Sequence, residues 1–268
     1  TKAMAMVGAS IGLTFAASLI LSPLLYQWIG MGGIFALTGI FSVLAIFVVV
    51  YVVPAAPSLP PAQVSIREIL AHGELMRLNF GVFALHLTQM AMFVVIPSAL
   101  IRFAQLPLAE HWKIYLPVVI ASFVLMLPPI FIGEKRGKSK QVFVAAIALL
   151  LLVQIGMWLA LSQTQLHAAW LVGLLLAFFV AFNILEASQP SLVSRIAPPG
   201  SKGTALGVYN TLQALGLFCG GALGGWLTQH VGGASVFVLG SALCVVWLII
   251  AANMKNLPRR SQAQAAVV

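Results

Sequence analysis

The sequence predicts an all-helical membrane protein, and its composition and apolar patterning lead to that prediction. Hydrophobic residues make up 61% of the chain and charged residues only 7%, against about 25% charged residues in a soluble domain. The apolar residues form eight segments, and each segment is long enough to cross about 30 Å of hydrocarbon as a helix. These segments are 4–26, 31–54, 78–101, 112–132, 141–162, 168–193, 204–228 and 231–254.

Between the second and third segments, residues 55–77 differ in composition. Prolines make the first part of this stretch stiff and extended. The tetrapeptide Ser-Ile-Arg-Glu at 65–68 has the form of a capping box, which predicts a short helix with Ile66, Ile69 and Leu70 on one side. We interpret the stretch as a cytoplasmic linker that carries an interfacial helix and separates two domains.

The most charged stretch is 133–140, with five charges in eight residues between two apolar segments. Four of these charges are Lys or Arg, and basic loops are retained on the cytoplasmic side of a membrane. Counting spans outward from this loop places twelve Lys and Arg residues inside, and only Arg102 and Lys113 outside. Both termini are then cytoplasmic. The basic residues therefore serve as orientation signals, and the net charge of +9 does not indicate a nucleic-acid partner. The other predicted loops are 102–111 and 163–167 outside and 194–203 inside.

An internal repeat indicates how the spans are grouped. Shifting the chain by 202 residues gives seven identical pairs in 23 aligned positions, among them Gly30 with Gly232. Because this offset equals six spans, residues 1–54 are expected to be the last two helices of a first six-helix half. Residues 78–254 would then be a complete second half, followed by a cytoplasmic tail at 255–268.

The charged loop also resembles the loop motif of the major facilitator superfamily, Gly-x-x-x-Asp-Arg/Lys-x-Gly-Arg/Lys-Arg/Lys. Glu134 occupies the Asp position, while Ile130 replaces the leading Gly and Ser139 the second terminal basic residue. The resemblance implies a fold of two parallel six-helix repeats, with eight of its twelve helices in this chain and the first four expected to be missing. It makes the loop a candidate gate, and a simple orientation signal is the alternative. The candidate gating residues are Glu134, Lys135, Gly137 and Lys138.

The first span resembles the antiporter motif of the same superfamily, Gly-x8-Gly-x3-Gly-Pro. Counting back from Pro23 places Ser22, Ser18 and Ala9 at the three Gly positions. All three are small, which meets the need for close helix approach. The repeat partner of this span is rich in glycine, and plain helix packing and a hinge are both open interpretations there. Its candidate packing residues are Gly220 and Gly224.

Glu186 is the only acid inside a predicted span. A charge at membrane depth costs about 2.5–3.5 kcal/mol on the insertion scale, so it is usually retained for function. Asn183 lies one turn earlier on the same face, and Pro190 removes the hydrogen bond that the carbonyl of residue 186 would otherwise accept. Glu186 is therefore a proton-coupling candidate. The alternative is a structural carboxylate tied to a Lys or Arg.

His86 is a second proton-coupling candidate, inside the third span. A polar stripe follows it on the same helix, and a second polar patch lies on the seventh span. A histidine satisfied by a neighbouring helix is the alternative. The candidate residues for a substrate cavity are Asn183, Gln89, Phe93, Tyr209, Asn210 and Gln213.

The segments around Glu186 and around Tyr209 resemble the tenth and eleventh helices of bacterial drug-proton antiporters of this superfamily. The resemblance implies a secondary transporter, not an enzyme, that exports small amphipathic molecules by exchange with protons. The alternatives are a same-fold transporter of a polar metabolite and a membrane scaffold that transports nothing. We expect a multi-pass protein of the bacterial inner membrane, monomeric when full length, with no cofactor. Cys219 and Cys244 are scattered in apolar spans, and neither a disulfide nor a metal site is expected.

Overall fold

The computed structural model describes residues 2–54, 66–163, 167–198 and 200–255, and its long elements are all α-helices. The chain divides into two compact units, Thr1–Ala62 and Gln63–Val268. The division falls inside the proline-containing stretch between the second and third apolar segments.

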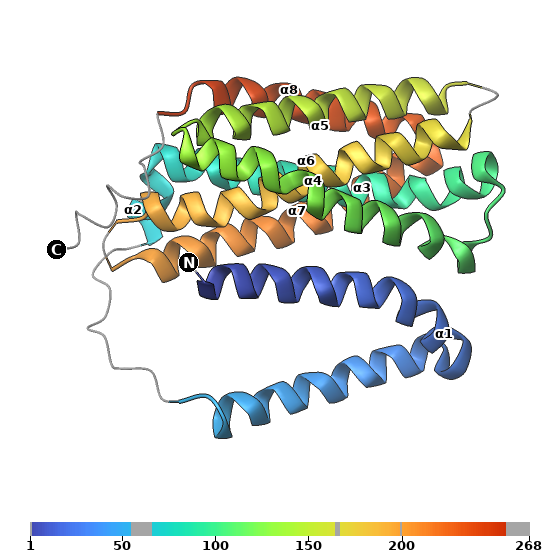
Figure 1. Cartoon of the computed structure of the whole chain (residues 1–268), viewed down its shortest axis with the longest axis horizontal. Coiled ribbons are helices and arrows are strands. Elements are labelled where there is room, and N and C mark those ends of the chain that lie inside the picture. Colours follow the sequence, from blue (N-terminus) through green and yellow to red (C-terminus); the bar gives the residue numbers. More distant parts are fainter. Residues whose placement is uncertain (1, 55–65, 164–166, 199, 256–268) are drawn as a thin grey trace. The chain divides into compact units, whose positions relative to one another are not determined.

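The first unit consists of helix α1, Lys2–Tyr51, which is interrupted at Gly30. Gly30 has φ 64° and ψ −177°, and glycine adopts a positive φ without steric cost. The chain reverses direction there (Figure 1), so that α1 comprises two arms, one for each of the first two predicted spans. Large apolar side chains such as Trp28 and Phe35 are exposed in this unit, and an apolar surface of this kind requires cover by lipid or protein.

The second unit starts with a short helix and continues with six long ones that run side by side (Figure 1). A 3₁₀ turn, η1 (Leu108–Glu110), precedes the second long helix. The helices are α2 (Ile66–Ala71), α3 (Gly73–Ala104), α4 (Trp112–Lys135), α5 (Ser139–Leu161), α6 (Ala168–Ile196), α7 (Lys202–His230) and α8 (Ala234–Ala252).

Helix α2 occurs where a short helix is predicted. Ile69 is fully buried, whereas Ile66 is 60% and Leu70 46% exposed. Exposed apolar side chains are compatible with a helix that lies on a membrane surface, and the interfacial position of α2 stays a prediction. Ser65, the first residue of the predicted capping box, lies outside the described residues.

Helix α3 is the centre of the second unit. It contacts α6, α7 and α8, and its side chains are buried along much of its length, including Leu78, Leu85 and Met92. The imidazole of His72 accepts the backbone N–H of Leu75 at 3.4 Å and so caps its first turn. The helix ends at Gln105, which has φ 51°. A polar side chain on the buried part of α3 therefore lies inside the bundle.

Six segments of the described chain are long and apolar enough to cross a membrane, against eight predicted from the sequence. One part of the difference is that the segment found in α1, Leu21–Tyr51, includes only the last residues of the predicted span 4–26. The other part is α7, whose 29 residues include seven glycines and several polar side chains that lower its hydropathy. The predicted all-helical fold is confirmed, and α7 is the span that composition alone marks least clearly.

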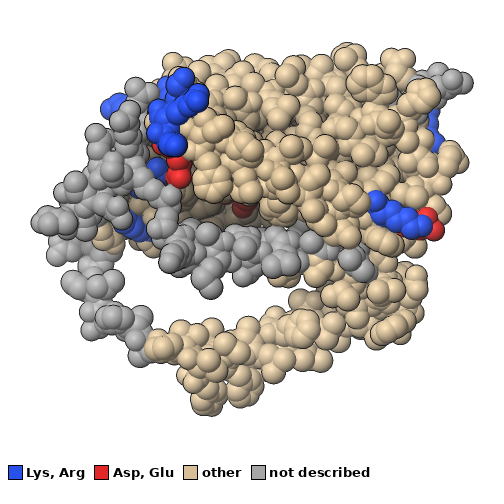
Figure 2. All heavy atoms as spheres, in the orientation of Figure 1, with Lys and Arg blue, Asp and Glu red and all other residues tan. Residues whose placement is uncertain are grey.

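The basic residues of the second unit gather at the ends of its helices. Figure 2 shows Lys and Arg at two opposite ends, and the surface between them is uncharged except for a recessed acidic group. We call the end with residues 133–140 the loop end. The first turn of α3 and the last turn of α8 meet there, because Arg77 Nη1 donates to the carbonyl oxygen of Asn253 at 2.7 Å. Arg102 and Lys113 belong to the opposite end, where α3 ends and α4 begins.

The carbonyl groups at the end of α8 are satisfied by side chains from two other helices. Lys140 Nζ donates to the carbonyl oxygen of Ala252 at 2.9 Å and also to that of Met254. Arg77 donates the third hydrogen bond, to the carbonyl oxygen of Asn253. Cations at a helix C-terminus also interact favourably with the helix dipole. The loop end of α3, α5 and α8 is thus joined by hydrogen bonds to main-chain atoms.

Candidate functional site

Three helices bring His86, Glu186 and Gln213 into one polar cluster. His86 lies on α3, Glu186 on α6 and Gln213 on α7. Gln213 Nε2 is 2.8 Å from His86 Nε2 and donates to Glu186 Oε1 at 3.4 Å. His86 Nε2 lies 3.5 Å from Glu186 Oε2. The two proton-coupling candidates are therefore within ion-pair distance, although 100 residues separate them in the chain.

The backbone of α3 fixes the tautomer of His86. Its Nδ1 is 2.9 Å from the carbonyl oxygen of Val82, and a carbonyl can only accept, so Nδ1 carries a proton. The neutral ring then presents a lone pair at Nε2 to the amide of Gln213. The protonated ring instead presents an N–H, which can be donated to Glu186. Nε2 of His86 thus accepts a hydrogen bond when the ring is neutral and donates one when the ring is protonated.

The cluster lies at the edge of the protein interior. His86 is 3% exposed, and the side chain of Glu186 is 35% exposed, although its Oε2 is buried without a hydrogen-bond partner in the described chain. The hydroxyl of Tyr209 and both amide atoms of Gln189 are also buried and unpartnered among the described residues. An unsatisfied buried polar atom costs about 1–3 kcal/mol. Helices α6 and α7 therefore both carry buried polar atoms that have no hydrogen-bond partner in the described chain.

Aromatic rings cover the cluster on one side. The ring of Phe182 meets His86 edge to face, with centroids 5.7 Å apart, and stacks on Phe178 at 5.8 Å. Phe93 continues this surface through Phe178 and also contacts Tyr115 of α4 at 6.0 Å. Aromatic rings and the polar cluster of His86, Glu186 and Gln213 thus lie next to each other.

The other residues predicted to line a cavity lie in different surroundings. Asn183 donates to Ser122 Oγ of α4 at 2.8 Å, so its amide faces α4 instead of the carboxylate one turn away. Gln89 is half-buried and Asn210 is exposed. The two pockets described for this chain both include residues of the loop end, and neither is lined by Glu186. The cluster is a polar contact between helices, with no enclosed cavity described around it.

The partners of Glu186 bear on its alternative interpretation as a structural carboxylate. Its hydrogen-bond and ion-pair partners in the described chain are Gln213 and His86. Neither is a Lys or Arg, which the structural interpretation would require.

A stripe of small residues on α7 allows that helix to lie directly against α3. A Cβ built on Gly216 would be 2.5 Å from the carbonyl oxygen of Phe83, and one on Gly224 would be 2.8 Å from Cα of Ala91. A Cβ on Gly220 would overlap the carbonyl oxygen of Leu87. Only glycine permits such an approach. This packing brings Gln213 within reach of His86.

The predicted residues of the first unit all belong to α1. Ser18 and Ser22 are exposed on α1, and Pro23 is half-buried within it. The side chain of Ala9 lies outside the described residues.

The charged loop forms a tight turn between α4 and α5. Gly137 has φ 68°, and the N–H of Lys138 donates to the carbonyl oxygen of Gly133 at 2.7 Å. Lys135 and Lys138 are exposed, and Glu134 lines a small pocket together with Arg195 of α6.

Sequence reasoning missed three residues that the structure brings into play. Ser122 is a single serine in an apolar span, and nothing in its neighbourhood distinguishes it from a helix-satisfied hydroxyl. Gln189 lies beside Pro190 in the segment already singled out, so its polarity was a usable signal. Lys140 falls outside the loop motif by one position, and its contact with α8 spans 112 residues of sequence.

In the described chain, no group of three or more His, Cys, Asp or Glu residues is suited to hold a metal ion. Cys219 and Cys244 are both free thiols.

Taken together, long apolar helices and a buried histidine–carboxylate contact define a multi-pass α-helical membrane protein with titratable groups inside its bundle. Residues 1–221 match the sequence profile of the Major Facilitator Superfamily. The chain belongs to this superfamily, and the family predicted from the loop motif is confirmed.

Named transporters are among the similar proteins. The chain is 40% identical over 264 residues to the inner membrane transport protein YajR of Escherichia coli, covering 96% of this chain and 57% of that protein. It is 26% identical over 255 residues to an uncharacterized transporter of Buchnera aphidicola, covering 92% and 64%. It is 27% identical over 188 residues to the multidrug resistance protein MdtH of Aeromonas salmonicida, covering 70% and 44%. The chain therefore spans between about two fifths and two thirds of the length of these relatives.

Proposed function

We propose that this chain is part of a proton-coupled secondary transporter that exports small amphipathic molecules across the bacterial inner membrane. The observation that carries the proposal is the contact of His86 with Glu186 and Gln213 inside the bundle. Ionisable residues in membrane spans commonly belong to proton relays, and this pair joins two helices. Proton binding here can therefore change how α3 and α6 are held together.

The comparisons support the transporter class. Several relatives are named as transporters, and one is named for multidrug resistance. In this proposal, residues 1–54 and 78–254 belong to two halves that move against each other around a shared path. Glu134, Lys135, Gly137 and Lys138 would act in the gate at the loop end.

The surroundings of the pair favour an amphipathic substrate over a polar metabolite. The half-buried rings of Phe93 and Phe182 lie on either side of the fully buried Phe178, next to His86. Aromatic faces bind apolar rings and cations, whereas a strongly polar solute would need more hydrogen-bonding groups than the pair supplies. Gln89, Tyr209, Asn210 and Gln213 would orient the substrate, whereas the amide of Asn183 is already hydrogen-bonded to Ser122.

A flux experiment tests this function directly. The full-length protein is placed in inverted membrane vesicles, and accumulation of a lipophilic cationic dye is followed by fluorescence with the proton gradient on or off. We expect accumulation only with a gradient and its collapse on addition of a protonophore. Vesicles without the protein are the control. Accumulation that is unchanged by the protonophore would contradict proton coupling, and no accumulation of any lipophilic dye would contradict the substrate class.

The orientation of the bundle is a separate prediction, because it depends on the basic residues alone. In a variant with Cys219 and Cys244 replaced by serine, Ser139→Cys reports on the loop end and Ala109→Cys on the opposite end. In intact cells, an impermeant maleimide is expected to label the cysteine at position 109 and to label that at 139 only after permeabilisation. Strong labelling of position 139 in intact cells would reverse the predicted topology.

A further inference from the structure

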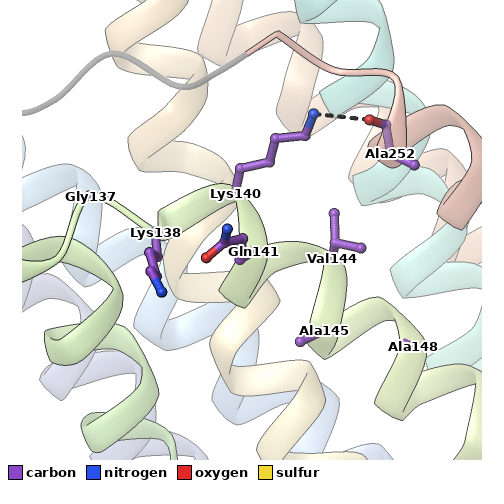
Figure 3. A pocket seen from close by; sticks show the side chains of 8 residues that line it. All are labelled: Gly137, Lys138, Lys140, Gln141, Val144, Ala145, Ala148 and Ala252. Carbon is purple, nitrogen blue, oxygen red and sulfur yellow. Dashed lines mark hydrogen bonds between the residues drawn. The ribbon is translucent and has the colours of Figure 1, made fainter.

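A groove at the loop end has the chemical make-up of a binding site, and it is separate from the polar cluster. It has a volume of about 560 Å³ and lies along α5, with one contribution from α8. Its residues are shown in Figure 3, with Lys140 reaching toward the carbonyl of Ala252. The lining consists of Gly137, Lys138, Lys140, Gln141, Val144, Ala145, Ala148 and Ala252.

The lining changes from cationic to apolar along the helix. Lys138 is at the start of α5, and Gln141, Ala145 and Ala148 follow at spacings of three and four residues, which place them on one face. From Gln141 to Ala148 the helix rises about 10 Å. This is the order of groups that a phospholipid presents, with a charged head at the interface and chains toward the bilayer centre.

The cationic part of the groove has free hydrogen-bonding capacity. The side chain of Lys138 is exposed, and its ammonium group has no hydrogen bond or ion pair among the described residues. Lys140 uses two of its three N–H donors on α8 and keeps one. Helix α5 has no side-chain cap at its N-terminus, and uncapped N–H groups at a helix start favour anions.

The net charge of the groove indicates which kind of ligand it can bind. The lining contains two lysines and no acid, and the adjacent Glu134 lines the other pocket, with Arg195. From these observations we infer that the groove binds an anionic phospholipid, with its phosphate at Lys138 and Lys140 and an acyl chain along Val144, Ala145 and Ala148. Basic pockets between helices at this membrane level suit such head groups.

The binding experiment uses the full chain, residues 1–268, in detergent micelles and titrates lipid by native mass spectrometry. Palmitoyl-oleoyl phosphatidylglycerol is compared with the phosphatidylcholine that has the same acyl chains. We expect at least one phosphatidylglycerol to bind more tightly than phosphatidylcholine. Lys138→Gln is expected to weaken phosphatidylglycerol binding about fivefold, the effect of about 1 kcal/mol per basic residue near a membrane surface.

Matched variants separate a groove from a generally basic surface. Lys202→Gln removes an exposed charge from the same end but outside the groove, and it should leave the affinity unchanged. Ala145→Phe fills the apolar part and should abolish the preference for phosphatidylglycerol, whereas Leu152→Phe, on an exposed part of α5 outside the groove, should not.

Three outcomes would overturn the inference. The first is equal binding of the two lipids, and the second is an equal loss in Lys202→Gln and Lys138→Gln. The third is displacement of phosphatidylglycerol by millimolar sodium phosphate, which would make the ligand a free anion instead of a lipid. Because Lys138 and Ala145 are exposed, their variants should fold normally and elute from a size-exclusion column at the volume of the parent protein. A variant that elutes normally and keeps the parent's preference for phosphatidylglycerol would also contradict the site.

Discussion

Replacing Glu186 by Gln is expected to abolish proton-driven export in the full-length protein while substrate binding is retained. Glutamine has the shape and the hydrogen-bonding groups of the neutral acid but cannot release a proton. Its amide can still contact Gln213 and His86, so the helices should remain together. The measurement is dye accumulation in inverted vesicles, with binding of the same dye to purified protein measured in parallel.

The control for this experiment is Glu110→Gln, which removes a carboxylate that is ion-paired with Lys113 at 2.7 Å outside the bundle. Exposed pairs contribute about 0–1 kcal/mol, so export should be unchanged. If Glu186→Gln exports normally and still needs the gradient, coupling lies elsewhere and His86 is the next residue to test. If the variant does not insert or fold, Glu186 has a structural role. Each of these results would contradict the proposed proton site.

Gly220→Ala is expected to destabilise the protein, although alanine is the better helix former. The added methyl group would overlap the backbone carbonyl of Leu87 on α3, so the two helices must separate along their whole contact. Overpacking of this kind costs about 1–3 kcal/mol, and the loss should appear as a lower unfolding temperature in detergent.

The matched control is Gly207→Ala on the same helix, where a Cβ meets no atom within 4 Å. This change should be neutral or stabilising by up to about 1 kcal/mol, because alanine favours helix over glycine. The two substitutions are chemically identical and are expected to have opposite signs. Equal effects at positions 207 and 220 would show that glycine is not required for α3 and α7 to pack.

The helices were predictable because the bilayer imposes their length. Spans marked from hydropathy and loop charge agree with α3 to α8 within about five residues at each end. Gly30 and Gly232, which the repeat pairs, both have a positive φ, of 64° and 110°. What composition could not predict is which helix lies at the centre, because all the spans are similarly apolar.

The site was predictable as separate residues but not as a cluster. His86, Glu186 and Gln213 each stand out as polar groups in apolar spans, and their meeting depends on the glycine stripe of α7, which sets the distance to α3. Helical spacing predicts Asn183 on the same side of α6 as Glu186. It could not show that α4 would supply Ser122 as the partner of Asn183, since one helix face touches more than one neighbour.

The hydrogen bonds at the end of α8 have a mechanical consequence. Three of them join Arg77 and Lys140 to main-chain atoms at the end of α8. The helices α3, α5 and α8 are therefore held together at the loop end. Sliding any of these helices past another would break bonds that no side-chain rotation can replace. Motion at that end is therefore expected from α4 and α6, which are themselves linked through Ser122 and Asn183. The proposed proton site, where His86 faces Glu186, would lie between this second pair and the three joined helices.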